Sequence, residues 1–316
     1  MMANINEAMN EYVSDLVISK SERTVRTYTY AVRSYIEYLH AESGVEETEH
    51  IELKTALSYI RAQARHGLSR GTLAVYAAAI RSFLRWLALE GISSFGFEAF
   101  LQTMERLSEL VGPPGQRIPK VPKEEDVELL FRYVRWQPPF LSDRQEILWY
   151  RNRALLEMIR ATGARVSEVC NLYADELDPD LRAATITGKG DKERKVWFDN
   201  YAWTALQEYI EKRGIEGQHV PIFIRHDNAQ TDDIHPADPR VIIYALEQAC
   251  KAVGIGYINP HKFRHRYATI MLALTGDLAV TQDLMGHANP ATTRIYAQVA
   301  DHRLSAARDL MEKATL

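Results

Sequence analysis

Two arginines, one lysine, two histidines and one tyrosine in the second half of the chain could together cleave a phosphodiester bond. They are Arg165, Lys189, His261, Arg264, His287 and Tyr296. Such cleavage needs a nucleophile, fixed positive charge for the pentacoordinate phosphorus and an acid for the leaving oxygen. A phenol, with an ordinary pKa of about 10, needs dense positive charge nearby to attack at neutral pH. The set fits phosphoryl transfer without a metal.

The residue types divide this chemistry between them. Planar guanidiniums bind non-bridging oxygens bidentately, and one fixed donor typically contributes about 3 kcal/mol to the transition state. Arginine does not release a proton readily, so a lysine or histidine must protonate the leaving hydroxyl. The sequence shows no H-E-x-x-H motif, no close Cys or His pairs and no Walker loop. We therefore expect no metal and no cofactor.

The first two local motifs are weak when taken alone. Arg165 follows a glycine in A-T-G-A-R-V-S-E, and Glu168 lies three residues further on the same helical face. A surface ion pair would give the same pattern. Lys189 stands in T-G-K-G-D-K-E-R-K, where Gly-Asp suits a tight hairpin turn. A charged turn of this kind is commonly just solvated.

The third motif, H-K-F-R-H, follows the helix-starting pair Asn259-Pro260. His261 and Arg264 are three residues apart, so one helical face presents an imidazole and a guanidinium together. A helix N-terminus with these groups suits phosphate better than metal. A charged cap on an exposed helix is the alternative.

The last two motifs follow each other directly. Gly286 has the character of a helix C-cap, and His287 is the first residue beyond it. Asn289-Pro290 then predicts a short helix that carries Tyr296. A lone tyrosine on an apolar face is usually a core residue. Tyr296 is a candidate nucleophile only because the other five residues accompany it.

The first hundred or so residues predict a helical domain, with helices at about 5–18, 21–40, 52–64 and 70–89. The second and fourth of these begin alike, with S-E-R-T and S-R-G-T, and both contain Arg-Ser followed by an aromatic residue. Two amphipathic helices that follow the same hydrophobic period would explain this similarity. The alternative is that their first turns face a DNA backbone, which makes Thr24, Arg26, Arg70 and Thr72 candidate DNA-binding residues.

Four prolines and two glycines between residues 111 and 122 cannot continue a helix and predict a linker. We expect an N-terminal domain over 1–110 and a catalytic domain over 123–316. Residues 183–198 alternate as two short strands that turn at 189–192. Basic residues beside these motifs, Lys192, Arg194 and Lys262, are further DNA-binding candidates.

Composition sets outer bounds. The 316 residues are 46% hydrophobic and 25% charged, as in ordinary globular proteins, and neither a signal peptide nor a run of about 20 apolar residues is evident. Cys170 and Cys250 lie far apart in apolar sequence, which favours buried thiols in a reducing cytoplasm over a disulfide. The net charge of −4 opposes a DNA-binding role unless basic residues cluster on one surface.

The order Arg, Lys, His-x-x-Arg, His, Tyr, with a tyrosine nine residues after the last histidine, resembles the tyrosine recombinases. This phage-integrase-type family, and its compact Xer-type branch above all, shares the contexts T-G-x-R-V-S-E, G-K-G-x-K-E-R, H-x-x-R-H and G-H. The resemblance is strong from about residue 118 onwards. It implies a mainly α fold of two domains: an all-α SAM-like core-binding domain and a mixed, mainly α catalytic domain with a small antiparallel sheet. Segments 136–149 and 226–239 have no assigned role.

The resemblance also implies a role for each residue of the set. Tyr296 would form a 3′-phosphotyrosyl link, Arg165 and Arg264 would hold the phosphate, and His287 would assist. Lys189 would be the general acid, and His261 would handle the tyrosine proton or a phosphate oxygen. Glu168 would orient Arg165.

The implied partners are double-stranded DNA and three further copies of the chain, in a tetramer on paired sites. The tail after the tyrosine would dock on a neighbouring subunit or pack on its own domain. We expect a cytoplasmic, nucleoid-associated protein without a membrane. The alternatives are a type IB topoisomerase or telomere resolvase with the same chemistry, and a DNA-binding accessory protein of the same fold that does not cleave.

Overall fold

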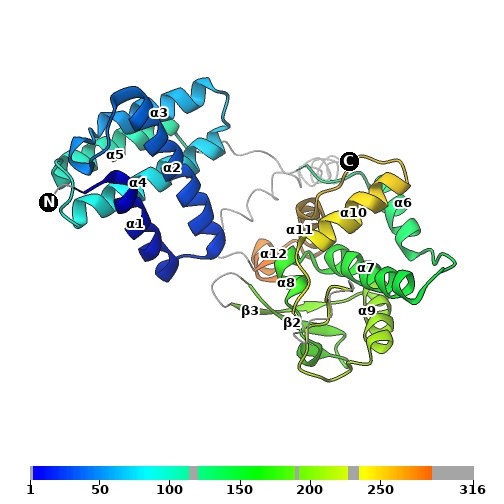
Figure 1. Ribbon diagram of the computed structural model, residues 1–316. Helices are drawn as coiled ribbons and strands as arrows, with labels where there is room; N and C mark the ends of the chain where they lie inside the picture. The colour runs from blue at the N-terminus through cyan, green and yellow to red at the C-terminus, as the bar shows by residue number, and fades with distance from the viewer. Residues whose placement is uncertain (1–2, 114–119, 189–191, 227–234, 287–316) are drawn as a thin grey trace, which may run out of the picture. The chain divides into compact units, whose positions relative to one another are not determined.

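The computed structural model describes residues 3–113, 120–188, 192–226 and 235–286. The chain divides into two compact units, Met1–Gln116 and Arg117–Leu316, and each is described by itself. Both are mainly helical, and the second adds a small antiparallel sheet (Figure 1). The predicted fold class, mainly α with a small sheet in the second domain, is confirmed.

The described residues of the first unit form helices in the order α1 (Ile5–Ser19), α2 (Glu22–Ser43), the 3-10 turn η1 (Thr48–His50), α3 (Lys54–Arg65), α4 (Arg70–Leu89) and α5 (Phe97–Val111), with one isolated β-bridge between Asn4 and Glu47. Ser21 and Ser69 cap α2 and α4 in the same way. Each serine Oγ accepts from the backbone N–H three residues on and lies 2.9 Å from a threonine hydroxyl, that of Thr24 or Thr72. The two similar sequence stretches are therefore two equivalent helix starts.

Helix α4 is the central element of this unit. It is long and apolar enough to cross a membrane by length and composition alone, a test that core helices of folded domains also pass. Here its apolar face, including Phe83 and Leu87, is fully buried in a core shared with the other helices. Two aromatic neighbours, Tyr12 of α1 and Trp86 of α4, pack edge to face on that core.

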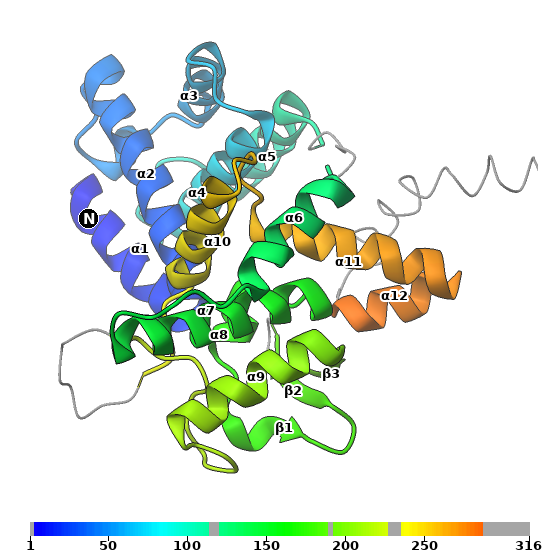
Figure 2. The ribbon, with the colours of Figure 1, turned by 90° about the vertical axis from the view of Figure 1, so that its right-hand side faces the viewer.

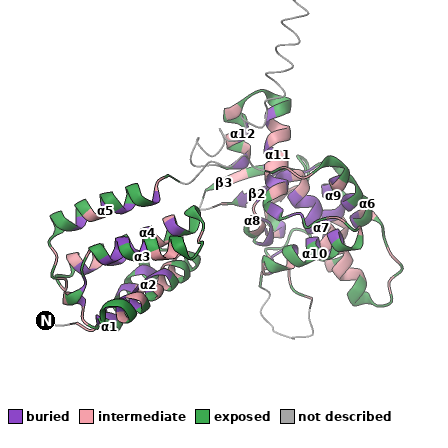
Figure 3. Ribbon diagram, turned by 90° about the horizontal axis from the view of Figure 1, so that it is seen from above, coloured by how far each residue is buried: buried purple, intermediate pink, exposed green. Residues whose placement is uncertain are grey.

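The second unit continues with α6 (Glu124–Arg135), α7 (Asp143–Thr162), α8 (Val166–Cys170), η2 (Ala174–Glu176), α9 (Asn200–Arg213), α10 (Arg240–Ala252), α11 (Pro260–Thr275) and α12 (Leu278–Met285). Helix α7 runs through its middle, with α6, α10 and α11 on one side and α9 and the sheet on the other (Figure 2). Buried residues accordingly concentrate along α7 and the faces turned towards it (Figure 3).

The sheet has three antiparallel strands in the order β1 (Leu177–Asp178), β2 (Ala183–Thr187) and β3 (Glu193–Trp197). The predicted hairpin is β2–β3, paired from Ala183↔Trp197 to Thr187↔Glu193. Beyond the last pair, the N–H of Gly188 donates to the carbonyl of Lys192 at 2.8 Å. The two-residue β1 is too short to leave a period in the sequence.

A buried ion network locks α6, α7 and α9 together. The carboxylate of Glu157 on α7 is fully buried and accepts from Arg135 and Arg160, each at 2.6 Å, and Arg160 also binds Asp199, the N-cap of α9, at 2.6 Å. A buried carboxylate left without such partners would be strongly destabilising. This network fixes the helices on which the candidate site depends.

Candidate active site

Arg165 is placed by the end of one helix and the start of the next. Helix α7 ends at the C-cap Gly163, which has a left-handed φ of 59°, and α8 begins one residue after Arg165. The chain thus turns sharply and leaves the Arg165 side chain 31% exposed. An arginine at such a turn can reach a ligand while its backbone stays fixed.

The partner predicted for Arg165 is confirmed as a contact. The carboxylate of Glu168 accepts from Arg165 Nη1 at 2.6 Å and from the Arg165 backbone N–H at 2.7 Å. Its side chain is only 2% exposed. Burial raises the pKa of this carboxyl, but hydrogen bonds from Arg194 and Arg165, with their charges, outweigh burial and lower it to about 2.

Arg194, on strand β3, supplies the other half of the Glu168 environment. Its Nη1 and Nη2 donate to the two carboxylate oxygens at 3.0 and 2.8 Å, and its Nε donates to the carbonyl of Leu284 at 3.2 Å. The side chain is 10% exposed. The sequence offered Arg194 as a DNA contact, whereas the structure gives it three hydrogen bonds to two protein residues, Glu168 and Leu284.

Arg264, on α11, is 3% exposed and joins the same region. Its Nη1 donates to the carbonyl of Gly163 at 2.7 Å, and its Nη2 donates to the carbonyl of Met285. These are the end of α7 and the end of α12. Arg264 thus reaches across 101 residues of sequence to Gly163, so the structure brings Arg165, Glu168 and Arg264 into one region.

His261 opens α11 as predicted. Its backbone N–H donates to the side chain of the N-cap Asn259 at 2.8 Å, and its imidazole is exposed and stacks on His265 with ring centroids 6.0 Å apart. Burial, and next the nearby charge of His261 and Arg264, lowers the pKa of His265.

Three predicted catalytic residues, Lys189, His287 and Tyr296, lie outside the described residues. The structure does describe where their segments begin. Gly188 and Lys192 flank residues 189–191 and are joined by a hydrogen bond. Gly286, with φ 59°, caps α12 as predicted and is the residue before His287.

One contact at this site was not predicted from the sequence. A Cβ added to Gly163 would lie 2.7 Å from Cδ1 of Tyr267, so α11 packs directly on the turn before Arg165. The sequence could place Tyr267 on the same helical face as Arg264, because Tyr267 follows Arg264 by three residues. It could not show that this face packs on residue 163.

The candidate DNA-binding residues of the first unit lie near the N-terminal ends of α2 and α4. Arg26 is exposed on α2, and Arg70 and Thr72 are exposed on the first turn of α4, with Thr24 half-buried. Of these residues, only Arg26 lines a shallow hollow beside α2, together with Glu22, Arg23, Thr27, Tyr30 and Tyr76. In the second unit Lys192 is exposed and Lys262 half-buried on the first turn of α11.

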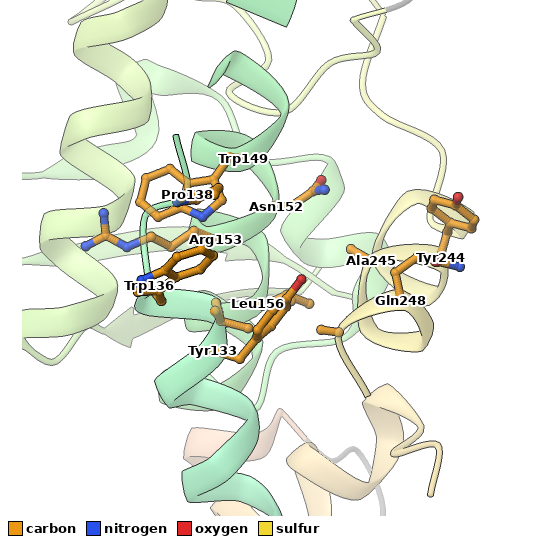
Figure 4. Close-up of a pocket in the computed structure, with 12 residues that line it drawn as sticks. Tyr133, Trp136, Pro138, Trp149, Asn152, Arg153, Leu156, Tyr244, Ala245 and Gln248 are labelled. Carbon is orange, nitrogen blue, oxygen red and sulfur yellow. The ribbon is translucent and has the colours of Figure 1, made fainter. Parts of the chain in front are cut away.

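A separate cavity of about 200 Å³ lies between α6, α7 and α10 (Figure 4). Tyr133, Trp136, Trp149 and Tyr244 give it an aromatic lining, and Arg153 stacks over Trp149 at 5.1 Å. The unassigned segment 136–149 thus supplies two walls of this cavity. None of the described candidate catalytic residues lines it.

Among residues the structure describes, no group of three His, Cys, Asp or Glu side chains could hold a metal ion.

The second half of the chain, residues 140–303, matches the phage integrase family, and residues 9–91 match the N-terminal SAM-like domain of phage integrases. Tyrosine recombinase XerC of Bacillus pumilus is 30% identical over 315 residues, covering 96% of this chain and 95% of that protein. Tyrosine recombinase XerA of Thermococcus kodakarensis is 30% identical over 317 residues, covering 100% of this chain and 98% of XerA.

Solved structures share the fold. XerH recombinase bound to its palindromic difH substrate superimposes with a TM-score of 0.71 at 21% identity, covering 91% of this chain and 80% of XerH. A lambda integrase dimer bound to a COC′ core site gives 0.63 at 14% identity, covering 93% of this chain and 95% of the integrase. The sequence matches extend over nearly the whole chain and both units, so the chain belongs to the phage integrase family of tyrosine recombinases.

Proposed function

We propose that this tyrosine recombinase cuts and rejoins duplex DNA at specific sites through a covalent bond from Tyr296 to a backbone phosphate. The observation that carries the proposal is the convergence of Arg165 and Arg264 on the turn at residues 163–168. Two guanidiniums held by fixed protein acceptors form a rigid cradle for a phosphate. XerH and lambda integrase, which share the fold, are bound to DNA in their structures.

The proposed step balances without any added reagent. The Tyr296 oxygen attacks phosphorus as its proton passes to His261 or a phosphate oxygen, and the bond from phosphorus to the 5′ oxygen breaks. Lys189 protonates that oxygen, so a 3′-phosphotyrosyl link and a free 5′-hydroxyl result. Arg165, Arg264 and His287 stabilise the charge on the phosphate. A 5′-hydroxyl from a second strand then reverses the step, so the link itself carries the bond energy and neither ATP nor metal enters.

Further parts of the proposal concern assembly and domains. We assign DNA-backbone contacts to the unit that contains α2 and α4 and catalysis to the unit that contains α6 to α12, with the linker at 111–122 joining them. Four copies act together on paired sites, with the tail after Tyr296 contributing to their contacts. The proposed substrate places the protein in the cytoplasm with the nucleoid.

The decisive experiment traps the covalent intermediate. The full-length protein first selects a duplex from a randomised library, and that duplex is then nicked near the cleaved phosphate so that the short leaving strand diffuses away. We expect a protein–DNA adduct that resists denaturation and disappears in Tyr296→Phe. The matched control is Tyr257→Phe, a change at an exposed tyrosine outside the site, which should trap as the wild type does.

Three results would contradict the proposal, each in a different way. An adduct that survives Tyr296→Phe would assign the nucleophile to another residue. Loss of the adduct on addition of EDTA would show that the chemistry needs a metal. Binding without any adduct in the wild type would support the non-cleaving accessory protein instead.

A further inference from the structure

We infer that Arg194 is a positioning residue for the proposed strand cleavage, because one guanidinium holds three segments of the site in register. This inference rests on the proposed function. Its three donors reach Glu168 at the start of α8 and Leu284 at the end of α12, and its own backbone belongs to β3. These are the segments that lead to Arg165, to His287 and to Lys189.

The contact with Glu168 sets the geometry of Arg165. Arg194 and Glu168 form a bidentate pair at 3.0 and 2.8 Å, the planar arrangement that guanidinium and carboxylate prefer. The carboxylate cannot rotate while both oxygens are held, and the same two oxygens bind the side chain and the backbone N–H of Arg165. Arg194 thus fixes the acceptor that fixes Arg165.

The contact with α12 sets the position of the last described residues. The Arg194 guanidinium lies so close to Gly286 that an added Cβ there would be 3.0 Å from Nη1. Gly286 also has φ 59°, a conformation that side chains rarely adopt. The glycine is therefore needed both for the helix cap and for the approach of Arg194.

The sequence position of Arg194 completes the argument. It pairs with Ile186 across the hairpin, two residue pairs from the turn that contains Lys189. Strand side chains alternate between the two faces of a sheet, so the hairpin must keep this register for Arg194 to reach Glu168. This register fixes Gly188 and Lys192, the described residues on either side of the segment that contains Lys189.

The inference predicts a change in rate without a change in DNA affinity. Arg194→Met should slow single-turnover adduct formation roughly 100-fold, the size expected of a misplacement of about 1 Å. The Kd for the selected duplex should stay unchanged, because Glu168 already neutralises this guanidinium. Arg194→Lys should recover part of the rate, since it keeps the charge but loses the bidentate fork. The matched control is Arg213→Met, which removes another partly buried arginine bound to backbone carbonyls, and it should keep the wild-type rate.

A pH profile separates positioning from a general loss of stability. The charged groups that face Glu168 in the described structure are Arg165 at the start of α8 and Arg194 on β3. From α12 the carbonyl of Leu284 binds Arg194, and Tyr267 of α11 lies close enough to Arg194 for the arginine's charge to oppose the effect of burial, which raises the pKa of the Tyr267 phenol. Without Arg194, fewer hydrogen bonds would oppose the effect of burial, so the pKa of the Glu168 carboxyl would be higher than in the wild type. The rate of Arg194→Met should therefore fall as pH is lowered through a range where the wild-type rate is flat.

The outcomes distinguish this inference from the proposed function. A wild-type protein that forms no adduct would overturn the proposed function. Adduct formation by Arg194→Met at the wild-type rate and with the wild-type pH profile would overturn only the inference, as would a weakened Kd with an unchanged rate, which would make Arg194 a DNA contact. A uniform loss of rate at every pH that matches a lowered Tm would also overturn it.

Discussion

The carboxylate of Glu168 receives four hydrogen bonds, two from Arg194 and two from Arg165, while its side chain is almost fully buried. Half of this arrangement was predictable and half was not. The spacing of three residues placed Glu168 beside Arg165 on one helical face. Arg194 is 26 residues further along the chain, and its charged neighbours in T-G-K-G-D-K-E-R-K gave no reason to single it out as buried. Tertiary contacts of this kind leave no local period in a sequence.

At the residue scale, the Glu168 carboxyl should make stability depend on pH. Its pKa in the folded protein, about 2, is below the ordinary value of 4.5. Its contribution is therefore fully present above pH 4.5 and is lost as pH falls towards 2. A shift of this size is worth on the order of 3 kcal/mol. Glu168→Gln should lower the urea midpoint at pH 7 and flatten its fall between pH 4.5 and 2.

The control for this measurement is Glu128→Gln, at an exposed position of α6, which should follow the wild-type curve. If Glu168→Gln and the wild type lose stability in parallel between pH 4.5 and 2, the carboxyl is not held ionised in the folded state.

At the scale of elements, several candidate catalytic residues lie at helix ends or directly next to them. Arg165 follows the end of α7, His261 opens α11, and His287 follows the end of α12. The sequence predicted the start of α11 and the end of α12, because Asn259-Pro260 and Gly286 are local signals. It gave no separate helix for α5. A two-residue strand such as β1 is defined by its pairing partner, so no pattern within it could have predicted it.

The turn at Gly163 is the most constrained of these ends. Gly163→Ala would force a side chain into a left-handed conformation and against the ring of Tyr267. The first effect alone costs about 1 kcal/mol, and the clash adds to it. We expect a Tm lowered by several degrees and slower adduct formation, since the carbonyl of Gly163 binds Arg264.

The matched variant is Gly214→Ala, at the left-handed cap of α9 where an added Cβ meets nothing within 4 Å. Its Tm should fall only by the amount that the left-handed backbone conformation causes, and its cleavage rate should equal that of the wild type. Equal losses of Tm in the two variants would show that the contact with Tyr267 relaxes easily.

At the scale of the whole molecule, a net charge of −4 has to be reconciled with a DNA substrate. The sequence could give only the sum of charges. The structure adds that Arg23 and Arg26 line one hollow with Tyr30 and Tyr76. Local clusters of this kind can bind phosphates whatever the total charge is, because screening limits each charge to about 10 Å at moderate salt.

Salt dependence tests this distribution. The logarithm of the association constant for the selected duplex should fall linearly with the logarithm of salt concentration. Arg26→Ala should reduce the slope by about 0.9, the value for one lost phosphate contact. Arg106→Ala, which removes an exposed arginine of α5 outside the hollow, should leave the slope unchanged. Equal slopes for all three proteins would move the DNA contacts away from Arg26.

The end of α12 has a consequence for how this enzyme can be recombined with its relatives. Its last two carbonyls, those of Leu284 and Met285, bind arginines from β3 and from α11. One inserted or deleted residue within α12 would turn those carbonyls by about 100° around the helix axis, so neither arginine would find its acceptor. The hairpin, α11 and α12 are therefore coupled through these two arginines. A chimera that exchanges residues 163–194 and 260–286 together should keep the contacts of both arginines, whereas exchanging either block alone should disturb the contact of Arg194 with Leu284 and that of Arg264 with Gly163.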